Sequence, residues 1–190
     1  KKRSMDHCES VCRSHRTSLP ETFNFGRDVV DQMARNKDKI ALIWCNDCNT
    51  EPVLTFQEIA DSSNQVANWL IEQDISQGDR VIVMLPRIPE WQICLTACLK
   101  LGAVPIPCIT MLTEKDIAYR MDHSGAAAVI TTAAETSKFQ TRLPTLKAAL
   151  AIGGAVAGWS DYELISDQDR RFECCDLGLD EPAIMYYTSG

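Results

Sequence analysis

Apolar runs alternate with helix-length segments through the middle of the chain. The runs lie at residues 81–85, 103–107 and 126–130, and each is a continuous stretch rather than an alternation of apolar and polar positions. Runs of about five such residues are typical of strands buried on both faces, as in parallel sheets. Because helical segments separate the runs, the pattern predicts an α/β fold with a mostly parallel sheet flanked by helices.

The two segments between these runs carry helix boundary signals. The first, residues 90–101, follows Pro89 and is stopped by Gly102, and the second, residues 114–123, ends before Gly125. Proline is tolerated in the first turn of a helix, and glycine is favoured just after the last turn. Both segments are therefore expected to be helices that connect neighbouring parallel strands.

A smaller antiparallel piece is expected before this unit. Residues 40–44 and 52–54 have the composition of two short strands joined by a turn, which predicts a hairpin. Thr55 and Glu58 then have the spacing of a capping box, so a helix is expected to begin there and to continue to Gln73. The hairpin is expected to lie at one side of the main sheet.

Further elements are expected nearer the two ends of the chain. They are a polar helix over residues 5–15, a helix over 25–35 capped by Asn24, a strand over 146–152, a short helix over 159–165, a loop over 167–180 and a strand over 183–187. In the helix over 25–35, the apolar face is expected to consist of Val29, Val30 and Met33.

Charge and composition narrow the range of partners. The 190 residues include 26 acidic and 19 basic side chains, giving a net charge of −7, and 45% of the residues are hydrophobic. This balance disfavours non-specific nucleic-acid binding, but it permits an anionic substrate because helix N-termini bind phosphate locally. Since no apolar run approaches the roughly 20 residues that a membrane-spanning helix needs, no membrane span is expected either.

The cysteines and histidines suggest only a secondary hypothesis. Nine cysteines are scattered through the chain, and their odd number and irregular spacing favour reduced thiols over a disulfide framework. Cys45 and Cys48 form a C-x-x-C pair that could hold zinc or act as a redox pair, but a second pair of ligands with suitable spacing is absent from the sequence. No metal site is therefore expected, and His7, His15 and His123 are expected on the surface.

Two segments have chemistry that suits a ligand site. Residues 186–190, Tyr-Tyr-Thr-Ser-Gly, leave an apolar segment with hydroxyl groups and a glycine, which can surround phosphate oxygens; a plain turn is the alternative. Arg87 follows the apolar run at 81–85, at the carboxyl end of a predicted parallel strand, where ligands bind in open α/β sheets. It is a candidate substrate contact, with a solvated arginine as the alternative.

Three segments, taken together, resemble the N-terminal part of AMP-forming acyl-CoA synthetases, which belong to the adenylate-forming superfamily. Residues 54–60 resemble the L-T-Y-x-E-L start of an early helix in that family, and residues 78–90 with 99–107 resemble its second core motif. Residues 183–190 resemble the strand that enters the phosphate loop, which continues in the family as Thr-Thr-Gly-x-Pro-Lys. Residues 23–31 and 85–91 are most similar to the branch that acts on medium-chain fatty acids and aromatic acids.

The resemblance implies a ligase that acts in fatty acid metabolism by a two-step reaction. A carboxylate attacks the α-phosphate of ATP, which gives acyl-AMP and pyrophosphate, and the thiol of CoA then takes the acyl group. By the same resemblance, Thr188, Ser189 and Gly190 bind the ATP phosphates together with Mg²⁺, and Thr110, Met111, Lys138 and Arg142 are the nearest counterparts of the CoA-binding residues. The family's catalytic residues lie beyond this segment, so none is expected within the chain.

The resemblance also implies how the chain is organised. Residues 1–22 are expected to be a helical extension, and residues 23–190 an incomplete AMP-binding domain that is cut at the start of the phosphate loop. Because the chain lacks an initiator methionine, it is expected to be trimmed or expressed from within a gene, and its partner is expected to be the missing remainder of the same polypeptide. The isolated fragment is predicted to be inactive. A cytoplasmic location is expected, or the mitochondrial matrix if a transit peptide has been removed.

Two alternatives remain open from the sequence. One is an adenylate-forming domain whose acyl acceptor is not CoA, such as a carrier-protein loading domain. The other is a non-catalytic, cysteine-rich α/β binding module, in which the C-x-x-C pair at residues 45–48 binds zinc or the surface binds a protein. The zinc content of the purified chain separates the second alternative from the ligase hypothesis.

Overall fold

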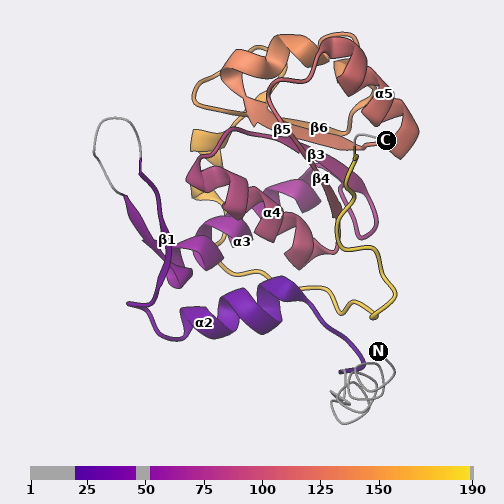
Figure 1. Cartoon of the computed structure of the whole chain (residues 1–190). Helices are drawn as coiled ribbons and strands as arrows, with labels where there is room; N and C mark the ends of the chain where they lie inside the picture. Colours follow the sequence, from indigo (N-terminus) through magenta and orange to yellow (C-terminus); the bar gives the residue numbers. More distant parts are fainter. Residues whose placement is uncertain (1–19, 46–51, 189–190) are drawn as a thin grey trace, which may run out of the picture.

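A parallel sheet forms the centre of the fold. The computed structural model of the chain describes residues 20–45 and 52–188, and in them five parallel strands lie in the order β4-β3-β5-β6-β7 (Figure 1). The strands are β3 Arg80–Met84, β4 Val104–Cys108, β5 Ala128–Thr132, β6 Ala148–Ile152 and β7 Ser160–Asp161. The expected α/β fold with a mostly parallel sheet is therefore confirmed, and the three apolar runs form its three adjacent strands β4, β3 and β5.

Helices cover both faces of this sheet. Helices α3, Phe56–Glu72, and α4, Pro89–Leu101, pack on one face, and helix α5, Glu114–Ser124, lies on the other with the 3₁₀ turns η2, Ala133–Phe139, and η3, Leu143–Thr145 (Figure 1). Alternate residues of β3 serve the two faces: Val81 and Val83 belong to the core under α3 and α4, and Ile82 and Met84 belong to the core under α5. Burial on both faces explains why these strands have no polar alternation.

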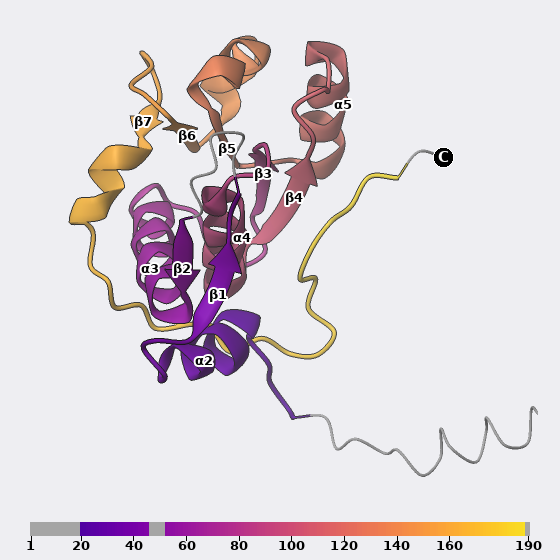
Figure 2. The ribbon, with the colours of Figure 1, turned by 60° about the vertical axis from the view of Figure 1, so that its left-hand side comes forward.

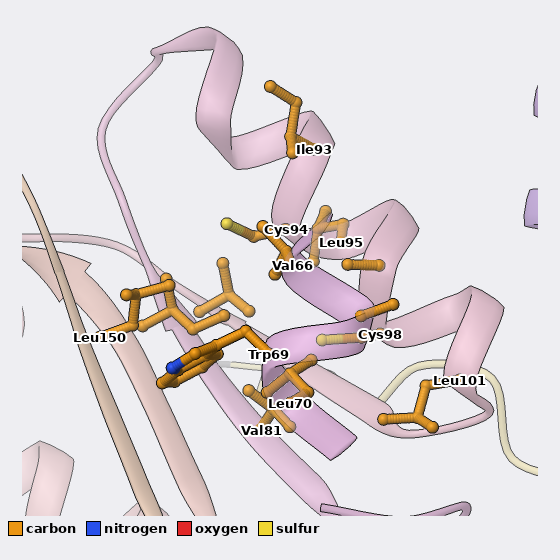
Figure 3. Packing of buried hydrophobic residues seen from close by; sticks show 14 of the residues in the cluster. Val66, Trp69, Leu70, Val81, Ile93, Cys94, Leu95, Cys98, Leu101 and Leu150 are labelled. Carbon is orange, nitrogen blue, oxygen red and sulfur yellow. The ribbon is translucent and has the colours of Figure 1, made fainter. Parts of the chain in front are cut away.

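The larger core is built from two helices and the sheet. Figure 3 shows Val66, Trp69 and Leu70 of α3 packed between the sheet residues Val81 and Leu150 and helix α4. Helix α4 contributes Ile93, Cys94, Leu95, Cys98 and Leu101. The two cysteines four residues apart thus serve as small apolar core residues.

The helix ends follow the boundaries expected from the sequence. The hydroxyl of Thr55 accepts the N–H of Glu58 at 3.2 Å, and the Glu58 carboxylate accepts the N–H of Thr55 at 2.7 Å, which completes the predicted capping box of α3. These bonds lower the pKa of Glu58, with the Thr55 N–H as the largest cause. Helices α4 and α5 end at Gly102 and Gly125, whose φ angles of 76° and 62° favour glycine.

The N-terminal part of the described chain contains a hairpin and a short helix. Strands β1, Ile40–Ile43, and β2, Val53–Thr55, pair antiparallel as expected, and the expected turn between them falls largely on residues 46–51, outside the described residues (Figure 2). A helical segment consists of η1, Gly26–Asp31, with π-helical geometry, followed by the α-helical turn α2, Gln32–Ala34. The helix expected over residues 5–15 also lies outside the described residues.

One side of that helical segment was predicted wrongly. Asn24 acts as the expected cap, because its side-chain oxygen accepts the N–H groups of Gly26 at 3.0 Å and Arg27 at 3.3 Å. The buried face consists of Gly26, Val30 and Ala34, however, and Met33 is 38% exposed. Val29 and Met33 are also four residues apart, so the expected face had helical spacing but lay one position away from the face that is buried.

Two elements near the C-terminus also differ from expectation. The short helix expected over residues 159–165 is replaced by strand β7 followed by the 3₁₀ turn η4, Tyr162–Asp167. The strand pairs at only two positions, Leu150 with Ser160 and Ala151 with Asp161. A strand that pairs at two positions is too short to show a periodic pattern in the sequence. Its pairing depends instead on β6, which offers a free edge.

The strand expected over residues 183–187 forms no ladder. The segment makes a single backbone hydrogen bond to the sheet, in which the N–H of Met185 donates to the carbonyl of Pro105 at 3.1 Å. The N–H of Val104 points inward to β3, where it donates to Asp79, so the alternation of a strand turns residues 105 and 107 outward. Both are prolines, which have no N–H, and the outer side of β4 therefore accepts hydrogen bonds but donates none.

Among the described residues, the longest helices remain too short or too polar to traverse a lipid bilayer.

Candidate functional site

A largely apolar groove lies at the carboxyl ends of β3 and β4. It has a volume of about 810 Å³. Trp44 of the hairpin, Trp91 of the first turn of α4, Ile109 after β4 and Tyr187 near the end of the described chain all contribute to its walls, and Arg87 lies at its exposed rim. This is the edge of an open α/β sheet where ligands usually bind, so the structure places the candidate Arg87 where the sequence predicted it.

A side-chain hydrogen bond joins the described part of the hairpin to this groove. The indole N–H of Trp44 donates to the carbonyl of Arg87 at 2.6 Å. The loop that carries Arg87 is further constrained by Pro86, whose carbonyl accepts the N–H of Ile88 at 2.9 Å. The apolar wall from the hairpin and the cationic rim from the loop therefore form one connected structure, which suits a ligand with an apolar body and an anionic end.

The segment that leads to the predicted phosphate-binding residues lies along the same groove. It rises past β4 towards α5, and its described part ends at the exposed Thr188 (Figure 1). Ser189 and Gly190 lie outside the described residues. Of the three predicted ATP-binding residues, the structure thus locates only Thr188, next to the groove residue Tyr187.

Helix α5 contacts Tyr187 through three side chains. The hydroxyl of Tyr187 lies 2.9 Å from Nδ1 of His123 and 3.3 Å from the carbonyl oxygen of Arg120. The Arg120 guanidinium lies 5.1 Å from the centre of the Tyr187 ring, within the range of a cation–π contact. The ring of Tyr119 stacks on His123 and meets Tyr187 edge-on. His123 therefore makes a specific contact with Tyr187. The expectation that His123 lies on the surface did not predict this contact.

The four predicted CoA-binding residues are only partly brought together. The ammonium of Lys138 donates to the carbonyl of Thr110 at 2.6 Å and pairs with Glu135 at 2.5 Å, so Lys138 and the loop after β4 are in contact. Met111, in the same loop, is 85% exposed. Arg142 instead pairs with Asp122 of α5 at 2.6 Å.

Comparison with known proteins places the chain in a family. The model of the family described as "AMP-binding enzyme" matches residues 29–190. The chain belongs to this family. The chain is 34% identical over 98% of its length to "Acyl-coenzyme A synthetase ACSM4, mitochondrial" of Mus musculus. It is 33% identical over 92% of its length to "Acyl-coenzyme A synthetase ACSM5, mitochondrial" of Homo sapiens.

A solved structure agrees with these relatives. The chain superposes on the acyl-CoA synthetase of Brucella canis with a TM-score of 0.83 at 27% identity, and the match covers 92% of this chain and 33% of that one. The matched parts of the mouse and human relatives are 34% and 32% of their lengths. The chain thus spans about a third of the proteins it resembles, and the resemblance to acyl-CoA synthetases expected from the sequence is confirmed at the level of the family.

Within the residues that the structure describes, the cysteines form no metal centre. There, no three histidine, cysteine or acidic side chains gather as metal ligands would. Cys45 is exposed, and its predicted zinc partner Cys48 lies outside the described residues. Cys98 and Cys108 are buried, which raises their pKa values to about 12 and about 11 and keeps the thiols protonated near neutral pH.

Sequence reasoning missed the contacts that α5 makes with Tyr187. Tyr119 and His123 are four residues apart, so a helix places both on one face, and this signal was available. The partner was not, because Tyr187 is 64 residues beyond His123. A spacing on one helix predicts a shared face, but it does not say which distant segment that face meets.

Proposed function

We propose that the chain is the N-terminal part of an AMP-forming carboxylate–CoA ligase. Membership of the AMP-binding enzyme family and the names of the mouse, human and Brucella canis relatives support this proposal. The observation that carries it is the position of the segment ending at Thr188, which runs along an apolar groove at the ligand-binding edge of the sheet. The proposed reaction converts a carboxylate and ATP into acyl-AMP and pyrophosphate, and then transfers the acyl group to CoA.

The ATP phosphates are assigned to Thr188, Ser189 and Gly190 on the strength of the sequence resemblance. A hydroxyl group and backbone N–H groups on a small-residue loop are suitable donors for phosphate oxygens. Mg²⁺ accompanies the nucleotide in this proposal and neutralises charge on its phosphates.

The acyl group and CoA are assigned to neighbouring parts of the same edge. The volume of about 810 Å³ and the tryptophan-bearing walls of the groove suit a medium-chain or aromatic carboxylate. CoA is assigned to Thr110, Met111, Lys138 and Arg142. Contact between Lys138 and Thr110 supports a shared role for these two, whereas one guanidinium nitrogen of Arg142 is already paired with Asp122 of α5.

The chain's organisation is part of the proposal. Residues 1–22 are an extension and residues 23–190 are the incomplete AMP-binding domain, whose remaining pockets belong to the rest of the same polypeptide. The isolated 190-residue chain is therefore expected to be inactive. Because the mammalian relatives carry "mitochondrial" in their names, the mitochondrial matrix is favoured over the cytoplasm for the parent enzyme.

The test compares the 190-residue chain with the product of its whole parent reading frame. Pyrophosphate release is measured with ATP, Mg²⁺ and a panel of octanoate, hexanoate and benzoate, with and without CoA. The parent is expected to release pyrophosphate and form acyl-CoA, while the 190-residue chain does neither. Acyl-CoA formation by the short chain, or a parent that releases no pyrophosphate with any acid in the panel, contradicts the proposal.

Two further measurements separate the alternatives. Hydroxylamine traps an acyl-adenylate as a hydroxamate in a reaction without CoA, and acyl-CoA is measured separately in a reaction without hydroxylamine. Hydroxamate in the first reaction with no acyl-CoA in the second indicates an acceptor other than CoA. Stoichiometric zinc in the purified chain, measured by atomic absorption, supports the cysteine-rich binding module instead.

A further inference from the structure

The segment that carries Tyr187 needs an anchor other than the sheet. Strand β4 exposes an outer edge whose outward positions are Pro105 and Pro107, and within the described residues only the carbonyl of Pro105 accepts a backbone hydrogen bond, from the N–H of Met185. One hydrogen bond fixes a point but not the direction of the chain that follows it. The direction of the backbone at Thr188 must therefore be set by side chains.

Tyr187 makes side-chain contacts that can set this direction, and the neighbouring Tyr186 does not. Among the described residues, the hydroxyl of Tyr187 meets His123 and Arg120, and its ring meets Arg120 and Tyr119. Tyr186 is 64% exposed and takes part in none of these interactions. Successive side chains of an extended segment point to opposite sides, so only Tyr187 can be held by α5 while Tyr186 faces away.

The hydrogen bonds of the Tyr187 hydroxyl specify the tautomer of His123. A phenol has one hydrogen, so it cannot donate to His123 and to the Arg120 carbonyl at once. Both contacts are satisfied when Nδ1 of His123 carries a proton and donates to the Tyr187 oxygen at 2.9 Å, while the hydroxyl donates to the Arg120 carbonyl at 3.3 Å. His123 is then a donor that fixes the phenol in one orientation.

We propose that His123 and Tyr187 are positioning residues for the phosphate-binding segment, which begins at Thr188. Together with Arg120 they form a cluster that we call the clasp. Tyr187 directly precedes Thr188, so its ring fixes the last point before the residues assigned to the ATP phosphates. The clasp acts on Thr188 through the backbone, and the Tyr187 side chain also lines the groove assigned to the acyl group. It rests on the proposed function, since it acts by holding Thr188 where the phosphates of ATP are expected.

The first experiment tests the clasp without ATP. In the 190-residue chain, hydrogen exchange of the Met185 amide and ¹⁵N relaxation of the Thr188 amide are measured by NMR. Tyr187→Phe removes the hydroxyl and keeps the ring, and Tyr186→Phe is the matched control. Tyr187→Phe is expected to accelerate exchange at Met185 by about 5-fold and to raise the mobility of Thr188, because the hydroxyl's hydrogen bonds are lost. Equal behaviour of the two variants overturns the clasp.

The second experiment tests its role in catalysis, in the product of the whole parent frame. Tyr187→Phe and His123→Leu are expected to lower pyrophosphate release about 10- to 100-fold, while the KM for CoA and the melting temperature stay near those of the wild type. His123→Asn, whose amide can replace the Nδ1 donor, is expected to restore most of the rate.

The outcomes distinguish this inference from the proposed function. If the Tyr187→Phe chain is loosened at Met185 but the variant parent works at the wild-type rate, the positioning role is wrong. If the wild-type parent releases no pyrophosphate at all, the proposed function fails and the positioning role fails with it, while the hydrogen-exchange result still establishes the clasp. Loss of rate with rescue by His123→Asn supports the proposal.

Discussion

The ammonium of Lys100 lies 2.7 Å from the carboxylate of Asp31, although the side chain of Lys100 has no exposed surface. The same nitrogen also donates to the side-chain oxygen of Asn64 at 2.5 Å and to the carbonyl of Ala60 at 3.3 Å. A lysine has three donors, and all three are used. The buried charge thereby connects α4 to η1 and to α3, and it stabilises the arrangement of three elements.

Removing this charge is expected to destabilise the fold. Lys100→Met leaves Asp31 without its counter-ion and Asn64 without its donor, and breaking a buried pair in this way costs about 3 kcal/mol, near the lower end of the usual range because Asp31 is 33% exposed. Urea unfolding measures the loss. The matched control is Lys147→Met, which breaks the exposed pair with Asp79 and is expected to change the free energy of unfolding by about 1 kcal/mol or less. Equal effects of the two substitutions contradict the assigned role of Lys100.

The close approach of Gly26 to Lys100 gives a second prediction. A Cβ atom at residue 26 would lie 2.1 Å from Cγ of the buried Lys100, so Gly26→Ala forces the lysine or η1 to move. Overpacking of this kind is expected to cost about 2 kcal/mol of stability. Gly178→Ala is the control, because its new Cβ has no neighbour closer than 3.8 Å and its φ is not positive. A Gly26→Ala chain with the melting temperature of the control argues against this packing.

The capping box of α3 predicts a pH dependence. The Thr55 N–H and hydroxyl lower the pKa of Glu58 from its ordinary value of 4.5. A depressed folded-state pKa adds stability above the unfolded value, and this part is lost as the pH falls from about 4.5 through the folded-state pKa. Glu58→Gln keeps a side chain that can close the box but does not titrate. Its free energy of unfolding is therefore expected to fall less steeply than that of the wild type below pH 4.5, and parallel profiles speak against the effect.

Thiol reactivity is expected to separate the cysteines by burial. Burial raises the pKa of Cys98 to about 12, and it raises that of Cys94 well above the ordinary value, so neither forms thiolate near neutral pH. Cys45 is exposed. Iodoacetamide at pH 8, followed by peptide mass spectrometry, is expected to label Cys45 in the native chain and to label Cys94 and Cys98 only in denaturant. Rapid native labelling of Cys98 contradicts its place in the core.

The sequence determined the elements whose signals are local. The apolar runs over 81–85 and 126–130 predicted buried parallel strands, the pair Thr55 and Glu58 marked the start of α3, and Gly102 marked the end of α4. These signals succeed because hydrogen bonding within a helix turn, and burial of both faces of a strand, are decided by residues a few positions apart.

The tertiary structure alone decided how distant segments meet. The segment over 183–187 has the composition of a strand, yet it forms no ladder, because Pro105 and Pro107 remove the donors from the edge that it approaches. Lys100 has the polarity of a surface residue, yet it is buried, because Asp31 and Asn64 of other elements accept hydrogen bonds from its ammonium. For the candidate site, the sequence supplied Arg87 and Thr188 as separate residues, whereas the contact of His123 with Tyr187 depends on two distant segments packing on the same face of the sheet, which no local pattern encodes.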